Sequence, residues 1–377
     1  MERPCRFPWA TSWFCAARSR STSETGLSHS SSGGIHEVHR LWQDRPQGIP
    51  GGPRHGQLRD RLGLLRRSHV STAIFDAYAE AGGNFIDSAD VYQFGQSEEL
   101  LGTLLEGRRE NFVLATKFTR GATPNANPLV IGNSRKAMIA SLEASLKRLK
   151  TDRIDIYWVH WPDGVTPTEE IIRGFEDLAR AGKILYAGIS NFPAWRLARA
   201  VTLAELADAV PIAAAPFEHS LVRREPRPNC SRRRTQGLGI VTWSPLGGGM
   251  LTGKYRKGEK GRAEGFGGKV FQPENSAQRT QVLDTVIAIA EELGVTPSPI
   301  AIVWAGTHGA VPIIGPRSLA QLVDNLGTLS VTLSGADQSA RCREQPCRLG
   351  ASEDTDPWGR GRCAEDCCLI CHTRIGL

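Results

Sequence analysis

Short, continuous apolar segments alternate with longer amphipathic ones from residue 71 to residue 327. Segments apolar at every position are typical of strands buried on both faces, and their alternation with helices predicts parallel βα units. We predict strands at 84–87, 112–117, 154–160, 184–189, 211–215, 239–243 and 310–314. We predict helices at 71–83, 97–106, 134–149, 168–181, 193–208, 276–293, 297–305 and 318–327. In the first helix, Ser71 is the predicted N-cap, and Gly82 and Gly83 end it.

These strand candidates are one short of a closed barrel of eight parallel strands. The predicted fold class is therefore α/β, a (β/α)8 TIM barrel whose first strand and N-terminal hairpin are missing or altered. Residues 58–65 could supply a substitute strand, but their arginines suit a central strand poorly. We divide the chain into a basic arm (1–70), a barrel (71–333) and a cysteine-rich tail (334–377), and we predict that the arm and the tail are disordered.

The formal net charge of +7 comes largely from the arm, which holds eleven Arg, no Lys and five acidic residues. The arm has no helical or strand periodicity and no nucleic-acid-binding motif, so we expect no nucleic-acid partner. No apolar run reaches transmembrane length, and the N-terminus lacks the apolar core of a signal peptide. Between 71 and 333 the one cysteine is Cys230. We therefore expect a cytoplasmic protein with no membrane partner.

Six of the nine cysteines lie in the last 36 residues, where the run Cys363-x3-Cys367-Cys368-x2-Cys371-His372 suggests a zinc site. A second paired motif is missing, and no strand or turn pattern surrounds the run. We predict no metal site.

Four polar residues lie at or just after the ends of successive predicted strands: Asp87, Tyr92, Lys117 and His160. In a β/α barrel, the carboxyl ends of the strands carry the catalytic groups. A phenol titrates near ~10, and an adjacent ammonium stabilises its phenolate. A carboxylate would hold the lysine, and a neutral histidine could orient a carbonyl oxygen. The four together predict a site that protonates an oxygen while a hydride reaches carbon.

Each residue also has an ordinary structural interpretation. Tyr92 could be a half-buried aromatic, Lys117 a surface lysine, Asp87 a cap or turn residue and His160 a core histidine. The common location of all four on one rim favours the catalytic interpretation.

Residues 71–333 resemble the aldo-keto reductase family, in particular its potassium-channel β-subunit-like and bacterial branches. The resemblance rests on the four residues above, on GISNF (188–192), on WSPLGGGMLTGKY (243–255) and on IIGPRSLAQLVDN (313–325). It implies a (β/α)8 barrel that reduces aldehydes or ketones with NADPH, with Tyr92 as the general acid. The expected partner is a small carbonyl substrate. The resemblance names neither the substrate nor the oligomeric state.

The resemblance also assigns cofactor contacts. Ser190 and Asn191 would hold the nicotinamide carboxamide, Trp243 would stack on the nicotinamide, and Arg317 would meet the 2′-phosphate of NADPH. The cofactor residues that it implies are Ser190, Asn191, Trp243, Ser244, Pro245, Leu246, Gly249, Lys254, Gly315, Arg317, Gln321, Asp324 and Asn325.

Some segments depart from the family pattern. Pro216 and His219 stand where the family usually has Gln and Tyr, an Arg-rich run occupies 223–236, and neither 1–70 nor 340–377 resembles the family. The sharp borders suggest translation out of frame, which the coding DNA would test. Two alternatives to the reductase stay open: a non-catalytic NADPH-binding regulatory subunit, and an inactive frameshifted product that folds poorly.

Overall fold

The computed structural model describes residues 57–123, 126–224, 238–257, 272–307 and 310–333. The chain divides into two units, Met1–Ser334 and Gly335–Leu377, and all the described residues belong to the first. The predicted arm up to residue 56, most of the Arg-rich run and the cysteine-rich tail lie outside the described residues.

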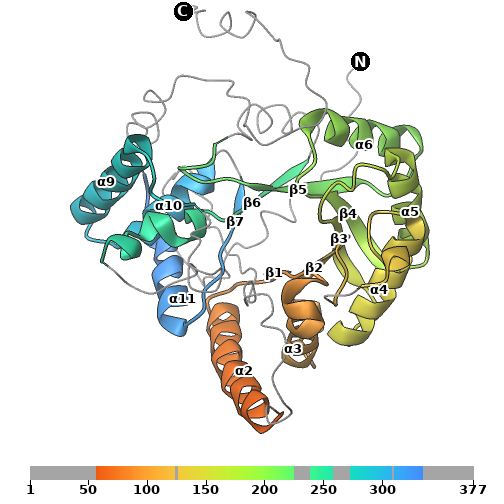
Figure 1. Ribbon diagram of the computed structural model, residues 1–377, viewed down its shortest axis with the longest axis horizontal. Coiled ribbons are helices and arrows are strands. Elements are labelled where there is room, and N and C mark those ends of the chain that lie inside the picture. The colour runs from red at the N-terminus through yellow and green to blue at the C-terminus, as the bar shows by residue number, and fades with distance from the viewer. Residues whose placement is uncertain (1–56, 124–125, 225–237, 258–271, 308–309, 334–377) are drawn as a thin grey trace, which may run out of the picture. The chain divides into compact units, whose positions relative to one another are not determined.

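Seven parallel strands form one sheet in which each strand pairs with the next in sequence. Their curved arrangement inside the helices is that of a (β/α)8 barrel, as predicted (Figure 1). The strands are β1 (Phe85–Asp87), β2 (Val113–Phe118), β3 (Ile154–Val159), β4 (Ile184–Ile189), β5 (Ile212–Glu218), β6 (Gly239–Trp243) and β7 (Val311–Ile313). No pairing between β7 and β1 occurs in the described part of the chain, so the described sheet is open between these two strands.

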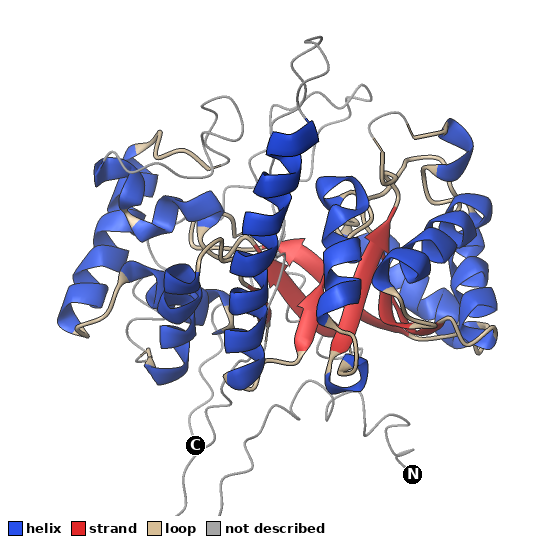
Figure 2. Ribbon diagram, turned by 90° about the horizontal axis from the view of Figure 1, so that it is seen from below, coloured by secondary structure: helices blue, strands red, loops and turns tan. Residues whose placement is uncertain are grey.

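The helices surround the strands on the outside (Figures 1 and 2). They are α2 (Gln57–Glu80), α3 (Gln96–Leu104), α4 (Arg135–Leu149), α5 (Thr168–Arg180), α6 (Ala194–Leu206), α9 (Ala277–Glu292), α10 (Pro297–Ala305) and α11 (Leu319–Leu326). Ser134, Ser276 and Ser318 cap α4, α9 and α11 by accepting a backbone N–H with the side-chain oxygen. These caps explain why the predicted starts of these three helices agree with the structure to within one residue.

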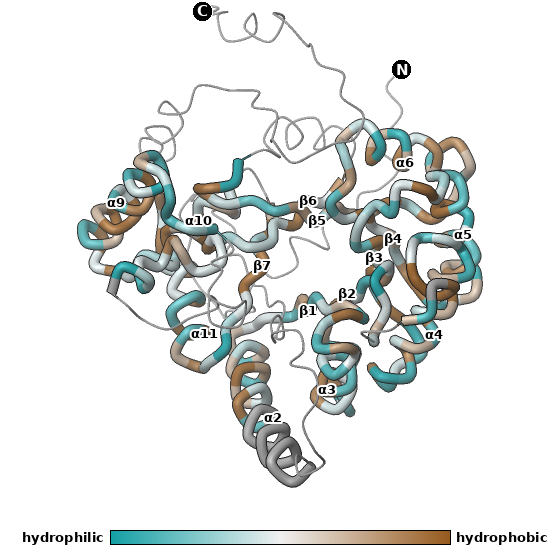
Figure 3. Tube along the Cα trace, in the orientation of Figure 1, coloured by the Kyte–Doolittle hydropathy of each residue, from teal (hydrophilic) through white to brown (hydrophobic). Residues whose placement is uncertain are grey.

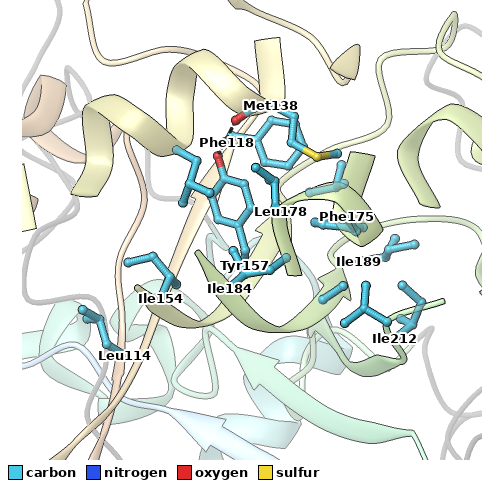
Figure 4. Close-up of a cluster of buried hydrophobic side chains, with 14 of the residues drawn as sticks. Leu114, Phe118, Met138, Ile154, Tyr157, Phe175, Leu178, Ile184, Ile189 and Ile212 are labelled. Atoms are coloured by element: carbon cyan, nitrogen blue, oxygen red, sulfur yellow. Dashed lines mark hydrogen bonds between the residues drawn. The ribbon is translucent and has the colours of Figure 1, made fainter. Parts of the chain in front are cut away.

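The main hydrophobic core lies between the strands and the helices outside them. Figure 4 shows part of it, where Phe118 and Tyr157 of neighbouring strands stack at 4.9 Å between ring centroids and Phe175 of α5 meets both rings edge-on. The Tyr157 hydroxyl donates to the Met138 carbonyl of α4 at 3.2 Å. Hydropathy follows this layering: β6 and β7 are hydrophobic, whereas the surrounding helices are mixed (Figure 3). Packing on both faces is the physical reason that the strands lack alternation.

A tyrosine hydroxyl occupies the open edge of the sheet. Tyr78 of α2 donates to the Phe85 carbonyl at 3.2 Å and accepts from the Phe85 N–H at 3.4 Å. The other edge of β1 faces β2, because the Asn84 carbonyl accepts from the Val113 N–H. Tyr78 thus satisfies two backbone groups that a preceding strand would otherwise pair. A Cβ on Gly83 would lie 2.1 Å from the Tyr78 ring, so glycine is required beside it.

The structure corrects the prediction for the start of the barrel. Helix α2 begins at Gln57, whereas we predicted an arm without regular structure up to residue 70. Ser71 is therefore buried inside the helix and is not its N-cap, and residues 58–65 are not a strand. Residues 57–70 contain Leu, Arg and Gln but no proline, and these residue types favour helix regardless of the irregular hydrophobic pattern.

Strand β5 is longer than predicted and continues through Pro216 to Glu218. Proline has no N–H to donate, yet Pro216 stays in register opposite Val241, and its carbonyl accepts from the Asn191 N–H.

Among the described residues no single helix is both long and apolar enough to cross a bilayer. One bent pair, α9 with α10 at 111°, meets the criterion by length and composition only.

Candidate active site

The structure brings together the four residues predicted to be catalytic. Asp87 is the last residue of β1, Lys117 lies near the end of β2, His160 directly follows β3, and Tyr92 begins a short 3-10 turn at Tyr92–Gly95. All four side chains are buried. Their common location follows from parallel pairing, because the carboxyl ends of parallel strands meet at one rim.

Lys117 and Asp87 form a buried ion pair at the centre of this group. The Lys117 ammonium also donates to the Ser88 carbonyl at 2.7 Å. The second oxygen of Asp87 accepts from the Trp158 indole N–H at 3.0 Å. A buried charge is costly unless it is paired and hydrogen-bonded, and here both partners are. The ammonium is therefore held in one place.

Tyr92 lies between the lysine and the histidine. The Lys117 ammonium nitrogen is 5.1 Å from the Tyr92 ring centroid, and the Tyr92 and His160 rings meet edge-on at 5.9 Å between centroids. The backbone after Tyr92 is strained, because Gln93 and Phe94 have φ of 49° and 53°. Such left-handed residues persist only where the surrounding structure enforces them.

Three predicted nicotinamide contacts form one hydrogen-bond network with His160. The Trp243 indole N–H donates to the Asn191 side-chain oxygen at 3.0 Å. The Asn191 amide in turn donates to the His160 carbonyl at 3.0 Å and to the Ser190 hydroxyl at 2.9 Å. Asn191 has φ of 61°, which asparagine tolerates better than most residues. This network fixes the Trp243 ring beside the catalytic rim.

The predicted cofactor residues that follow β6, from Ser244 to Lys254, lie in a series of tight turns. Ser244 has φ of 61° and accepts the Gly248 N–H at 3.2 Å, while Pro245 and Leu246 lead into the glycines. A Cβ on Gly249 would lie 3.0 Å from the terminal carbon and nitrogen of Lys254, so the ammonium folds against the glycine. Backbone N–H groups in turns of this kind, with a lysine beside them, form concavities that suit anions.

The predicted cofactor residues of the segment 313–325 lie between the end of β7 and the last turn of α11. The Gln321 side chain accepts the Arg317 backbone N–H at 2.9 Å, and Gly315 and Arg317 are exposed. Asp324 accepts from the Thr296 hydroxyl, and Asn325 is a buried residue in the last turn of α11. The structure thus places these five residues on one segment that follows β7.

Pro216 of β5 and His219, which directly follows β5, make defined contacts in this chain. The Pro216 carbonyl accepts from the Ser190 hydroxyl at 3.3 Å and from the Asn191 N–H at 3.1 Å. The His219 ring stacks on Trp304 at 5.0 Å between centroids. The Pro216 carbonyl therefore helps to position Ser190 and Asn191, the two predicted carboxamide contacts.

Asp90 and Glu98, on either side of Tyr92 in the sequence, form a buried acidic pair that the sequence pattern did not predict. Asp90 accepts from the Ser141 hydroxyl at 3.0 Å, and its other oxygen has no hydrogen-bond partner among the described residues. Glu98 pairs with Arg148 at 2.7 Å and accepts from Thr116 at 2.5 Å. Burial, and then the nearby Glu98, raise the pKa of the Asp90 carboxyl to about 7 from its usual 3.8.

Trp158 is the functional side chain that sequence reasoning missed most clearly. It occupies β3 two residues before His160, so both side chains point to the same face of the strand. A Cβ on Gly188 of β4 would lie 2.1 Å from the Trp158 ring, so that glycine makes room for the indole. The sequence did contain a signal for this role: Trp158 shares the strand face of His160, a candidate catalytic residue two positions later.

No group of three or more His, Cys, Asp or Glu side chains that could hold a metal ion occurs in the described ranges. The cysteine run of the tail lies outside these ranges.

A model of the Aldo/keto reductase family matches residues 64–344. A probable voltage-gated potassium channel subunit beta from Oryza sativa subsp. japonica is 37% identical over 69% of this chain and 81% of its own length. An aryl-alcohol dehydrogenase [NADP(+)] from Phanerodontia chrysosporium is 32% identical over 78% of this chain and 77% of its own length. An uncharacterized oxidoreductase, YrpG, of Bacillus subtilis is 34% identical over 69% of this chain and 82% of its own length.

Proposed function

The chain belongs to the aldo/keto reductase family of oxidoreductases, and we propose that it reduces aldehydes or ketones to alcohols with NADPH. One observation carries the proposal: a buried Asp87–Lys117 ion pair lies against Tyr92, which in turn meets His160. A relative named for NADP(+) and alcohol dehydrogenation supports the same chemistry.

The residues present fit NADPH. Lys254 and the Gly-rich turns offer a cation and backbone N–H groups for a pyrophosphate, and Arg317 offers a guanidinium for a 2′-phosphate. Ser190, Asn191 and Trp243 would hold the nicotinamide. When bound, NADPH supplies the hydride that the carbonyl carbon accepts.

In the proposed reaction Tyr92 donates its phenolic proton to the carbonyl oxygen. Lys117 stabilises the phenolate that forms, because its ammonium is close to the ring and cannot move away from Asp87. His160 donates a hydrogen bond that orients the carbonyl oxygen. The buried positions of all four residues exclude water from the proton transfer.

The test is NADPH titration by fluorescence, followed by turnover on a panel of carbonyl compounds. Tyr92→Phe should reduce turnover about 10²–10⁴-fold, or ~3–5 kcal/mol of barrier, and leave NADPH affinity nearly unchanged. A Tyr92→Phe protein that retains most of its turnover would disprove the assignment of the acid.

A second candidate function is a non-catalytic, NADPH-binding regulatory subunit. It is favoured by the similarity to a probable potassium channel subunit beta. Saturable NADPH binding with negligible turnover across the whole panel, equal in wild type and Tyr92→Phe, would support this alternative.

A further inference from the structure

An aromatic ring next to the catalytic group connects it to the rim of the barrel. Trp161 follows His160, and the two rings stack at 5.8 Å between centroids with an interplanar angle of 27°. The edge of the Trp161 ring also meets Trp243 at 6.4 Å. Trp161 therefore lies beside both the proposed carbonyl-orienting histidine and the proposed nicotinamide-stacking tryptophan.

A guanidinium covers this ring from the neighbouring loop. Arg120 lies three residues after Lys117 and is exposed, and its guanidinium carbon is 5.3 Å from the Trp161 ring centroid. The Trp161 ring thus contacts both the Arg120 guanidinium and the His160 ring. Stacking on an aromatic face restrains an arginine without using its N–H donors, which stay available for a ligand.

An unusual backbone conformation directly before Arg120 directs the chain toward Trp161. Thr119 has φ of 127°, an outlier for a β-branched residue. Its hydroxyl donates to the Asn133 side chain at 2.7 Å and accepts from the His160 N–H at 3.3 Å. The loop that supports the catalytic histidine therefore also determines where Arg120 lies.

Arg120 has no carboxylate within ion-pair distance in the part of the chain that the structure describes. Asp163 is in the loop that carries Trp161, but its oxygens accept from the Asn133 N–H at 2.8 Å and from the Thr166 N–H at 3.0 Å and hydroxyl at 2.5 Å. Arg120 is thus a positioned cation at the rim of the site, and none of the described carboxylates pairs with it.

We propose that Arg120 is a specificity-determining residue that binds a carboxylate group on the carbonyl substrate, an inference that rests on the proposed function. A guanidinium matches a carboxylate through two parallel hydrogen bonds. Because Arg120 and His160 both lie against the Trp161 ring, the favoured substrates are short, with the carbonyl and the carboxylate separated by about one aromatic ring.

The test compares 4-formylbenzoate with its neutral methyl ester, using the full chain and NADPH. Arg120→Gln should lower kcat/KM for 4-formylbenzoate about 10–100-fold, mainly through KM, and change the ester less than about twofold. Arg120→Lys should keep part of the preference, because it retains charge but not the planar fork. Arg173→Gln, which removes an exposed arginine from α5, is the matched control and should change neither substrate.

Equal losses on both aldehydes, or a wild-type preference for the ester, would overturn the inference and leave the proposed reductase standing. If wild type reduces neither aldehyde, the proposed reductase fails on these substrates, and calorimetric titration with terephthalate in the presence of NADPH decides about Arg120. Binding that Arg120→Gln weakens tenfold or more would support the carboxylate site. No saturable binding, or binding equal in the two proteins, would overturn it.

Discussion

The two arcs of the barrel prepare their sites in different ways. In the catalytic arc, β1–β4, functional side chains bind one another: Asp87 holds both Lys117 and the Trp158 indole. In the proposed cofactor arc, β5–β7 with α11, two of the predicted side chains bind backbone: Ser244 accepts the Gly248 N–H, and Gln321 accepts the Arg317 N–H. The catalytic arc therefore depends on buried charge, whereas the shape of the cofactor arc depends on backbone conformation.

This difference predicts different consequences of substitution. Removing one charge of the Asp87–Lys117 ion pair leaves its partner buried and unpaired, so both stability and chemistry should suffer. Removing an exposed side chain from the cofactor arc should change ligand affinity while the fold stays intact. Three variants test the comparison, from the largest expected effect to the smallest.

Lys117→Met should cost about 3–5 kcal/mol in the free energy of unfolding, because it leaves the Asp87 carboxylate buried without its ion pair. Urea denaturation followed by circular dichroism measures the loss. The double variant Lys117→Met with Asp87→Asn removes both charges, and it should recover most of the stability but none of the turnover. If the single variant unfolds at the wild-type urea concentration, the two arcs do not differ in this way.

Asp90→Asn sharpens the comparison within the catalytic arc. The Asp90 pKa of about 7 lies above its unfolded value, so the folded protein binds this proton more tightly than the unfolded chain. Stability should fall as pH rises from about 4 to about 7 and remain lowered above that range. Asp90→Asn should therefore be more stable than wild type at pH 8, by on the order of 2–4 kcal/mol.

The same variant should gain little at pH 4, where Asp90 is protonated in the folded protein. Melting temperatures of both proteins at the two pH values give the measurement. Other groups titrate alike in the two proteins, so the pH dependence of the difference reports Asp90. A difference of equal size at pH 4 and pH 8 would contradict the raised pKa.

Arg317→Ala tests the cofactor arc. Because Arg317 is exposed, its loss should leave the melting temperature unchanged. It should weaken NADPH about tenfold or more and NADH less than about twofold, since the 2′-phosphate is absent from NADH. Fluorescence titration with each cofactor measures both affinities. Equal weakening of the two would assign Arg317 a structural role at the start of α11.

The pattern of the sequence was sufficient for the order of the strands and for the residues at their ends. Continuous apolar segments, serine caps and the positions of Asp87, Lys117 and His160 are local features, and parallel pairing converts strand ends into one rim. Because the strands could be recognised from local sequence, the seven predicted strands correspond to the seven strands of the described residues.

What only the tertiary structure decided depends on partners distant in sequence. The Tyr78 hydroxyl bonds the backbone of Phe85 because no strand of the described part of the chain pairs with that edge of β1. Trp158 meets Asp87, and Arg120 covers Trp161, because adjacent strands and loops bring them within reach. Hydrophobic periodicity records which face of an element is buried, but it does not record which side chain lies on the other side of the contact.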